Sequence, residues 1–382
     1  METDHPRTSV REDAGFAASI LRREPISENG AVSPDMIAGR RVLVTGAGGF
    51  IGTGLARLMA ELGAGHLTLL DNAEHALYSV DVEIAEAHPR LSRKAFYCDV
   101  RDAVATEHCI VTEQPDFIFH AAALKQLPLV ETHVREGFLT NTLGALNVAA
   151  AAVTAGAHAV ILISSDKAAQ PSSALGATKR LAERAFAELD CRGGRTRFSS
   201  VRFGNVFAST GSVVPRFRAQ IARGGPVTLT DSRMTRFFIT RDEACRLVLS
   251  ALQLTFATGE RGELYVLEAG EPLSIAELAR RLIEHDAPEK HIPIVTTGAR
   301  EGERLSEILT RPDERVVATG LAGIIRIASS LPSLPLVRQA ILDLAVPAAA
   351  CDEERLHEGL VHLVPEFTGM LLRHNHRLAS SA

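Results

Sequence analysis

The sequence has few cysteines, and they show no pairing pattern. Five occur among the 382 residues, at Cys98, Cys109, Cys191, Cys245 and Cys351. Their wide separation lacks the paired spacings of a disulfide scaffold or a zinc site. We therefore expect reduced thiols in a cytoplasmic protein, and no metal centre.

The sequence also lacks an excess of positive charge and any long apolar run. The formal net charge is −5 and the pI about 6.3, so no broad basic field would hold a phosphate backbone, and we expect no nucleic-acid partner. No window reaches the ~18 to 20 uninterrupted apolar residues of a membrane span, and the charged N-terminus is unlike a signal peptide. These features predict a soluble protein without a membrane span.

What the chain does contain is an alternation of strand and helix patterns. Apolar residues make up 46% of it and charged residues 23%, which is enough for a large core. Short β-branched or aromatic runs alternate with stretches of helical spacing, which predicts an α/β fold with a Rossmann-type, doubly wound parallel sheet. The strand-forming runs are RRVLVT (40–45), HLTLLD (66–71), KAFYCDV (94–100), DFIFHAA (116–122), AVILISS (159–165) and FSSVRFG (198–204).

Changes in this pattern divide the chain into four regions. Residues 1–39 are expected to form an N-terminal arm or short helix, and residues 40–205 an NAD(P)-binding Rossmann domain. After residue 206 the alternation weakens into loops rich in Gly and Pro. Residues 206–330 are therefore expected to form mainly a smaller C-terminal substrate-binding lobe, with one strand near 263–268 returning to the sheet. Residues 331–382 should form a helical tail.

A glycine fingerprint lies between the first predicted strand and the helix after it. Gly46, Gly49 and Gly52, with Phe50 and Ile51 opening the helix, allow a tight turn and a close approach of backbone N–H groups to a pyrophosphate. This context predicts a dinucleotide site.

Small or acidic residues end the following strands, at the edge where a dinucleotide would bind. They are Asp71, Asp99, Val100, Ala121 and Ala122. The carboxylate of Asp71 would accept hydrogen bonds from a ribose, and no Arg follows it directly, which favours NAD. NADP stays possible, because a basic residue from elsewhere could compensate. His120, beside them, is either a core histidine or a ligand contact.

The candidate reactive groups lie in residues 163–180. Ser165, Asp166 and Lys167 leave the end of a predicted strand, and Lys179 lies on the next helix. A lysine there can hydrogen-bond a nicotinamide ribose and can lower the pKa of a nearby hydroxyl by its charge.

These stretches resemble a known family, the UDP-N-acetylglucosamine 4,6-dehydratases of polysaccharide biosynthesis, within the extended short-chain dehydrogenase/reductase superfamily. The resemblance covers roughly residues 20–368. Its densest motifs are VLVTGAGGFIG (42–52), HAAALKQLPLVE (120–131), SSDKAAQP (164–171), GATKR (176–180), VRFGNVFASTGSVVPRF (201–217) and MTRFFIT (234–240).

The resemblance implies oxidation of a sugar at C4, loss of water across C5 and C6, and return of the same hydride to C6. It implies that Asp166 is the acid, Lys167 the C5 base, Ser165 a group polarising the C4 oxygen and Lys179 a ribose ligand. It also implies a homo-oligomer and a nucleotide-sugar substrate. The residues expected to bind this substrate are Lys125, Arg202, Asn205, Thr235, Arg236 and Arg300.

The chain departs from the superfamily pattern at Leu175, where most members have a tyrosine four residues before the lysine. Leucine has no proton to exchange, so Lys179, Asp166, Lys167 or a water must replace that hydroxyl. Alternatives therefore stay open: another NAD(P)-dependent nucleotide-sugar epimerase, 5,6-dehydratase or oxidoreductase, or a non-catalytic dinucleotide-binding protein. Leu124 and Gln126 depart from the family motif more mildly, and they could alter the sugar pocket.

Overall fold

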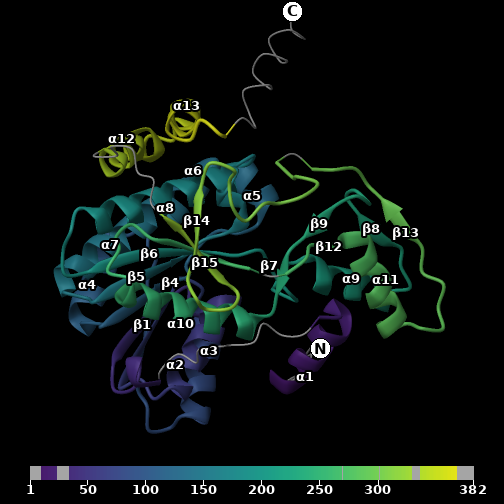
Figure 1. Cartoon of the computed structure of the whole chain (residues 1–382), viewed down its shortest axis with the longest axis horizontal. Helices are drawn as coiled ribbons and strands as arrows, with labels where there is room; N and C mark the ends of the chain where they lie inside the picture. Colours follow the sequence, from purple (N-terminus) through teal and green to yellow (C-terminus); the bar gives the residue numbers. More distant parts are fainter. Residues whose placement is uncertain (1–9, 24–33, 269, 301, 329–335, 368–382) are drawn as a thin grey trace, which may run out of the picture.

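The computed structural model describes residues 10–23, 34–268, 270–300, 302–328 and 336–367 (Figure 1). Its centre is a nine-stranded sheet in the order β14-β15-β11-β6-β5-β4-β1-β2-β3. The strands of this sheet are β1 (Arg41–Thr45), β2 (His66–Asp71), β3 (Ser92–Tyr97), β4 (Phe117–His120), β5 (Ala159–Ile163), β6 (Arg197–Arg202), β11 (Leu264–Leu267), β14 (Arg315–Ala318) and β15 (Ile324–Ala328).

The strands from β3 to β11 pair in parallel, so the predicted doubly wound α/β fold is confirmed. All six strand-forming runs of residues 40–204 contribute a strand. At the other edge, β15 pairs antiparallel with β11, and β14 pairs antiparallel with β15. These two strands were not predicted from the sequence. β14 is only four residues long and mostly exposed, so its short run RVVA does not stand out from the loops around it.

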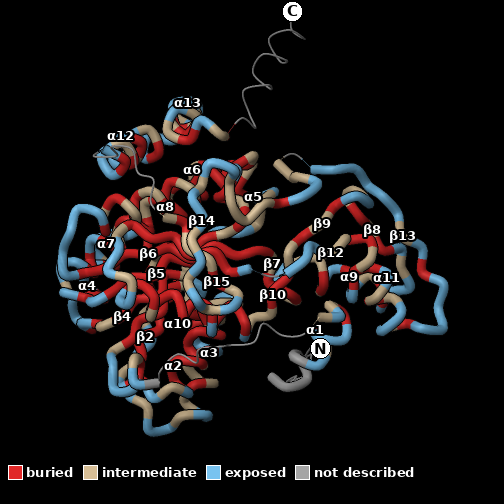
Figure 2. Tube along the Cα trace, in the orientation of Figure 1, coloured by how far each residue is buried: buried red, intermediate tan, exposed pale blue. Residues whose placement is uncertain are grey.

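Helices cover both faces of the sheet, and the buried strands between them form the core (Figure 2). α2, α3 and α10 pack on one face, and α4, α7 and α8 on the other. The helices of the chain are α1 (Val10–Leu21), α2 (Phe50–Glu61), α3 (Glu74–Ala87), α4 (Ala103–Glu113), α5 (Leu127–Thr132), α6 (Val134–Phe138), α7 (Gly144–Ala155), α8 (Ala174–Cys191), α9 (Val213–Ala222), α10 (Arg241–Ala257), α11 (Ile275–Asp286), α12 (Val337–Ala349) and α13 (Glu353–Leu363).

Among the residues that the structure describes, one helical stretch is long and apolar enough to cross a membrane by length and composition alone. It runs from Val134 to Ala155 through α6 and α7, and 56% of its most apolar window is buried inside the protein. Its α7 part packs on the sheet and against α4. A helix in the core of an α/β domain passes the same test, so this stretch is weak evidence for a span.

A smaller lobe lies beside the sheet (Figure 1). Its core joins α9 and α11 with three short strand pairs and with α1, whose Ala17 and Ile20 are buried in it. The N-terminal helix is therefore part of this lobe's core. The paired strands are β7 (Asn205–Val206) with β10 (Phe238–Ile239), β9 (Thr235–Arg236) with β12 (Leu273–Ser274), and β8 (Val227–Leu229) with β13 (Ile294–Thr296).

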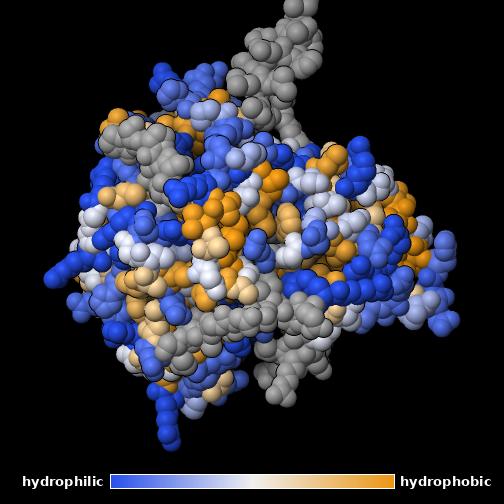
Figure 3. All heavy atoms as spheres, in the orientation of Figure 1, coloured by the Kyte–Doolittle hydropathy of each residue, from blue (hydrophilic) through white to orange (hydrophobic). Residues whose placement is uncertain are grey.

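The C-terminal helices α12 and α13 pack on the outer side of α8 and α6. Ile341, Leu356 and Phe367 are fully buried in a cluster that also holds Leu175 and Leu181 of α8. The surface in Figure 3 is mainly hydrophilic, with apolar side chains gathered near the middle of the view.

We expect Ile20→Ala to destabilise the smaller lobe, because Ile20 is 2% exposed and its removal leaves a cavity. Large-to-small core substitutions of this kind cost about 2 to 5 kcal/mol. The loss should appear as earlier urea unfolding of the lobe, with faster hydrogen exchange in α1 and α11. Ala18→Ser, on the exposed side of α1, is the control, and equal exchange in the two variants would show that α1 does not contribute to the core.

Candidate active site

Two adjoining cavities open at the carboxyl ends of the parallel strands, with volumes of about 590 and 430 Å³. They share the lining residues Gly46, Gly49, Ala121, Lys125 and Thr210, so they form one continuous hollow. Ligands of open α/β sheets bind at this edge. We call the first the strand-β2 cavity and the second the strand-β5 cavity.

The turn between β1 and α2 is built for close backbone approach. Gly46 has φ +63°, and a Cβ on it would lie 2.6 Å from the backbone nitrogen of Ala122. A Cβ on Gly52 would lie only 1.9 Å from the Gly46 carbonyl oxygen. Phe50, Ile51 and Gly52 open α2 and line the strand-β5 cavity, so the free N–H groups of the helix start lie at this hollow.

The predicted strand-end residues line the strand-β2 cavity. Asp71, Asp99, Val100, Ala121 and Ala122 are all among its lining residues. The two carboxylate oxygens of Asp71 accept hydrogen bonds from the N–H groups of Gly48 and Ala73, both at 2.9 Å. These bonds fix the carboxylate at the wall of the cavity, where its remaining lone pairs can accept from a hydroxyl.

The predicted reactive groups come together at the strand-β5 cavity. Ser165, Asp166, Lys167 and Lys179 all line it. Oδ1 of Asp166 accepts from Ser165 Oγ at 2.8 Å and lies 3.0 Å from Lys167 Nζ. Oδ2 of Asp166 is buried and has no hydrogen-bond partner among the described residues. The aspartate thus holds a short ion pair and still has an acceptor oxygen that is not used.

Lys179 has a different environment. Its Nζ donates to the Ile163 carbonyl at 2.9 Å, and burial, partly offset by Glu183, lowers its pKa to about 8. Leu175 lines the same cavity one turn earlier on α8 and offers only an apolar surface. The ionisable group that α8 places at this wall is therefore a buried amine with a pKa of about 8.

His120 behaves as a core histidine. It is 1% exposed, and its Nδ1 lies 2.7 Å from Thr45 Oγ1. Burial and the charge of Lys179 lower its pKa to about 3, so the ring is neutral near pH 7. It is not among the lining residues of either cavity.

Three of the predicted substrate ligands also line the strand-β5 cavity: Lys125, Asn205 and Arg300. Lys125 lies where the two cavities join, and partial burial lowers its pKa. The chain has only five lysines, and three of them, Lys125, Lys167 and Lys179, line this one cavity.

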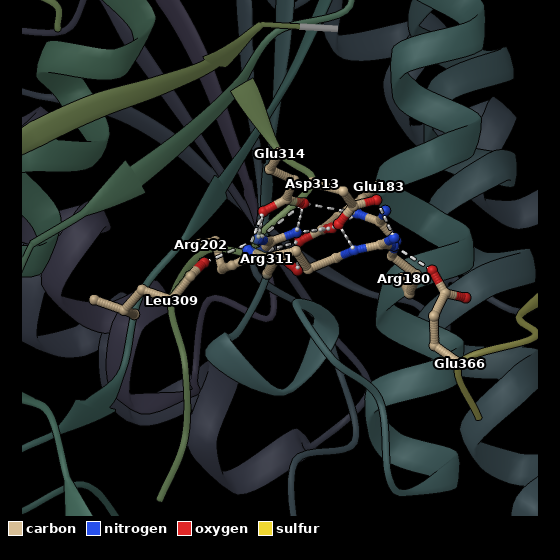
Figure 4. Close-up of polar contacts among 9 residues, drawn as sticks. Arg180, Glu183, Arg202, Leu309, Arg311, Asp313, Glu314 and Glu366 are labelled. Atoms are coloured by element: carbon tan, nitrogen blue, oxygen red, sulfur yellow. Dashed lines mark hydrogen bonds and ion pairs between the residues drawn. The ribbon is translucent and has the colours of Figure 1, made fainter. Parts of the chain in front are cut away.

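The expectation that Arg202 binds the nucleotide-sugar substrate is wrong. Its side chain is 0% exposed and lies between Glu183, at 2.8 Å, and Glu314, at 3.0 Å (Figure 4). It also donates to the Leu309 carbonyl at 2.9 Å. With its charge paired and its N–H groups used inside the protein, the guanidinium has no access to a ligand.

Arg236 and Thr235 are also scaffold residues and do not line either cavity. Arg236 donates to the carbonyl groups of Thr235, Arg304 and Leu305. Thr235 donates its N–H to the Leu305 carbonyl and contacts Ser306 with its hydroxyl at 2.9 Å. Both residues therefore hold the 304–307 segment beside the site through hydrogen bonds.

Sequence reasoning missed Glu307, which lies in this segment. Its Oε1 is 3.7 Å from Lys167 Nζ, and its side chain is 4% exposed. Arg300, seven residues earlier in the chain, was expected to bind substrate from the family resemblance. Nothing local in residues 300–307 indicates that residue 307 folds back onto residue 167.

The comparisons with known proteins agree with this geometry. A family model described as polysaccharide biosynthesis protein matches residues 42–329. The chain belongs to this family. Its architecture is that of the extended short-chain dehydrogenase/reductase superfamily, as expected from the sequence.

Three relatives illustrate the similarity. The probable polysaccharide biosynthesis protein EpsC of Bacillus subtilis is 39% identical over 303 residues, which are 78% of this chain and 49% of that protein. The UDP-glucose 4-epimerase of Rickettsia conorii is 33% identical over 300 residues, 76% of this chain and 84% of the relative. The X-ray structure of Pen from Bacillus thuringiensis has 29% identity and a TM-score of 0.71, covering 78% of this chain and 90% of Pen. This chain spans about half the length of EpsC.

We expect Arg202→Met to reduce stability strongly, because it removes the fully buried cation between the carboxylates of Glu183 and Glu314 and leaves them with Arg180 alone. Removing one partner of a buried ion pair costs about 3 to 5 kcal/mol. Denaturant unfolding would measure the loss. Arg300→Met is the matched control, since Arg300 is exposed, and similar unfolding of the two variants would contradict the structural role of Arg202.

Proposed function

We propose that the protein is an NAD(P)-dependent nucleotide-sugar 4,6-dehydratase acting on UDP-N-acetylglucosamine. The observation that carries the proposal is the Asp166–Lys167 ion pair at 3.0 Å, at the wall of a cavity that adjoins a glycine-rich helix start. An acid and a base side by side suit an elimination, in which one carbon loses a proton while its neighbour loses a hydroxyl. Membership in a polysaccharide biosynthesis family supports a sugar substrate.

The residues of the strand-β2 cavity fit a dinucleotide. Where this cavity joins the strand-β5 cavity, the missing Cβ atoms at Gly46 and Gly52 leave room for close backbone approach, and the start of α2, which lines the strand-β5 cavity, suits a pyrophosphate. In the strand-β2 cavity, the carboxylate of Asp71 can accept a hydrogen bond from a ribose hydroxyl. Arg101 lines the same cavity but is paired with Asp99 and with Glu136, at 2.6 Å for the latter, which supports NAD over the extra phosphate of NADP. When bound, the nicotinamide supplies the hydride acceptor and donor.

One internal proton transfer would prepare the ion pair for elimination. Burial alone would lower the pKa of Lys167, but the charges of Asp166 and Glu307 outweigh it and raise that pKa. The resting lysine therefore holds a proton and cannot act as a base. Passing this proton over 3.0 Å to Asp166 makes Lys167 a neutral base for the C5 proton. The same transfer makes Asp166 the acid that protonates the leaving C6 hydroxyl.

The apolar Leu175 requires another group to take the C4 hydroxyl proton. Lys179 is the candidate that the electrostatics favour, because a pKa of about 8 leaves a useful fraction of neutral amine near pH 7. Ser165 lines the cavity and would hold the C4 oxygen, as its position beside Asp166 suits.

A second candidate function is 4-epimerisation of a UDP-sugar. The relative of Rickettsia conorii that is named UDP-glucose 4-epimerase supports it, because the aligned region covers 84% of that protein. Inversion at C4 needs no acid and base at C5 and C6, so it gives no role to the Asp166–Lys167 pair. The two functions differ in product: the epimer keeps its mass, whereas the dehydratase product loses one water.

We expect Gly52→Ala to weaken NAD binding by about a hundredfold, because the new Cβ must displace the Gly46 carbonyl from the turn. Titration calorimetry with NAD would measure the change. Gly194→Ala is the control, since a Cβ there meets nothing within 4 Å. Wild-type affinity in Gly52→Ala would contradict the placement of the dinucleotide at this turn.

We expect purified protein with UDP-N-acetylglucosamine and catalytic NAD to give a product that has lost one water and carries a 6-methyl group. Mass spectrometry and proton NMR would detect both changes. Lys167→Met should lower the rate by about 10² to 10⁴, the contribution of a general base, while Lys290→Met, at an exposed lysine, should not. Unchanged turnover in Lys167→Met would exclude the base role, and a product of unchanged mass would favour epimerisation.

A further inference from the structure

We infer that Glu307 is a positioning residue for the reaction, whose carboxylate holds the Lys167 ammonium and sets the pH at which this lysine gives up its proton. The inference rests on the proposed function for the role of Lys167 in catalysis. The contact itself depends only on the structure.

Lys167 lies between two carboxylates that come from distant parts of the chain. Asp166 Oδ1 is 3.0 Å from Nζ, and Glu307 Oε1 is 3.7 Å from the same atom. Glu307 is not among the residues that line the strand-β5 cavity, whereas Lys167 is. Glu307 therefore acts on the cavity through the lysine.

Residues of β9 hydrogen-bond to the backbone just before Glu307. The guanidinium of Arg236 donates to the carbonyl groups of Arg304 and Leu305, at 2.9 and 3.1 Å. The Thr235 N–H donates to the Leu305 carbonyl at 2.9 Å. These bonds hold the residues just before Glu307 and so fix the start of its side chain near Lys167. Arg236 itself stays 3.9 Å from the Glu307 carboxylate.

A comparison of the two lysines of this wall isolates what the carboxylates do. Burial lowers the pKa of Lys179 to about 8, and Glu183 offsets this only in part. Burial acts on Lys167 in the same direction, yet its pKa is raised. The charges that reverse the direction belong to Asp166 and Glu307, while Arg236 opposes them weakly.

The charged groups facing this pair come from three elements. They are Asp166 beside Lys167, Arg304 on the segment of Glu307, and Arg236 on β9. On α8, which packs against residues 166–168, Lys179 donates to the Ile163 carbonyl instead. Burial and the charge of Asp166 raise the pKa of Glu307 itself, against the charges of Lys167, Arg236 and Arg304.

The charge of Glu307 affects the proton transfer that would make Lys167 a base. The lysine must transfer its proton to Asp166 before it can act as a base, and the Glu307 carboxylate opposes that transfer by stabilising the ammonium. Removing the charge of Glu307 should therefore lower the pKa of Lys167 and move the pH range of activity downward.

The test is competitive acetylation of the folded protein with trace acetic anhydride over a pH series, followed by peptide mass spectrometry. Only the neutral amine reacts, so the modification rate of each lysine reports its own titration. The chain has five lysines, and Lys94 and Lys290, which are exposed, serve as internal references. In Glu307→Gln we expect Lys167 to react about tenfold faster at a fixed pH below its midpoint, as a pKa lower by one unit gives.

Two further variants make the result specific. Glu303→Gln removes a carboxylate of the same segment that also lines the strand-β5 cavity, but its Oε2 accepts from the Arg300 N–H, whereas Lys167 pairs with Asp166 and Glu307. It should therefore leave the labelling of Lys167 unchanged. Glu307→Asp keeps the charge but withdraws it by one methylene, so its labelling should lie between wild type and Glu307→Gln. If Glu307→Gln does not fold, the smaller shift in Glu307→Asp provides the same test.

Labelling needs no turnover, so it separates this inference from the proposed function. Faster labelling of Lys167 in the Glu307 variants, together with no dehydratase activity in the wild-type protein, would support the contact and overturn the proposed reaction. Dehydratase activity with unchanged Lys167 labelling in a folded Glu307 variant would overturn the inference and leave the reaction standing. In an active enzyme, the pH–rate profile of Glu307→Gln should move to lower pH, and loss of stability alone would not produce that movement.

Discussion

Arg202 is the buried cation on which three parts of the structure converge. Arg202 lies on β6 and pairs with Glu183 on α8 and with Glu314, which directly precedes β14 (Figure 4). Arg180 contacts the same two glutamates, and Arg311 continues the network to Glu366 near the C-terminal helices. Such a network is stable only when every charge has its partner. The orientation of α8, and with it the position of Lys179, depends on this set of contacts.

The site that this framework supports separates two buried lysines by their surroundings. Lys179 has a backbone carbonyl as its partner and a pKa of about 8, whereas Lys167 has two carboxylates and a raised pKa. The same side chain thus has a lowered pKa at one position and is held as a cation at the other. For the proposed dehydratase, this difference would let a site with leucine at position 175 offer groups for two separate proton transfers.

Much of the fold and part of the site could be predicted from the sequence, because those features depend on local sequence patterns of a few residues. The parallel strands are short runs rich in β-branched, aromatic or other apolar residues, and the Gly46–Gly52 turn and the Asp166–Lys167 pair directly follow strand ends. Residues whose role depends on distant contacts could not be predicted in this way. Arg202 ends a strand, where ligand residues are also found, and only the positions of Glu183 and Glu314 make it structural. Glu307 reaches Lys167 across 140 positions, and no local pattern records such a contact.

The measurement that bears most directly on the central claim follows the hydrogen at C4 of the substrate. UDP-N-acetylglucosamine deuterated at C4 would be incubated with the protein and catalytic NAD, and the product analysed by NMR and mass spectrometry. We expect the deuterium in the C6 methyl group of a product that has lost one water, with no net formation of NADH. Deuterium retained at C4 of an epimer, or released to the cofactor pool, would contradict internal return to C6 and exclude the 4,6-dehydratase.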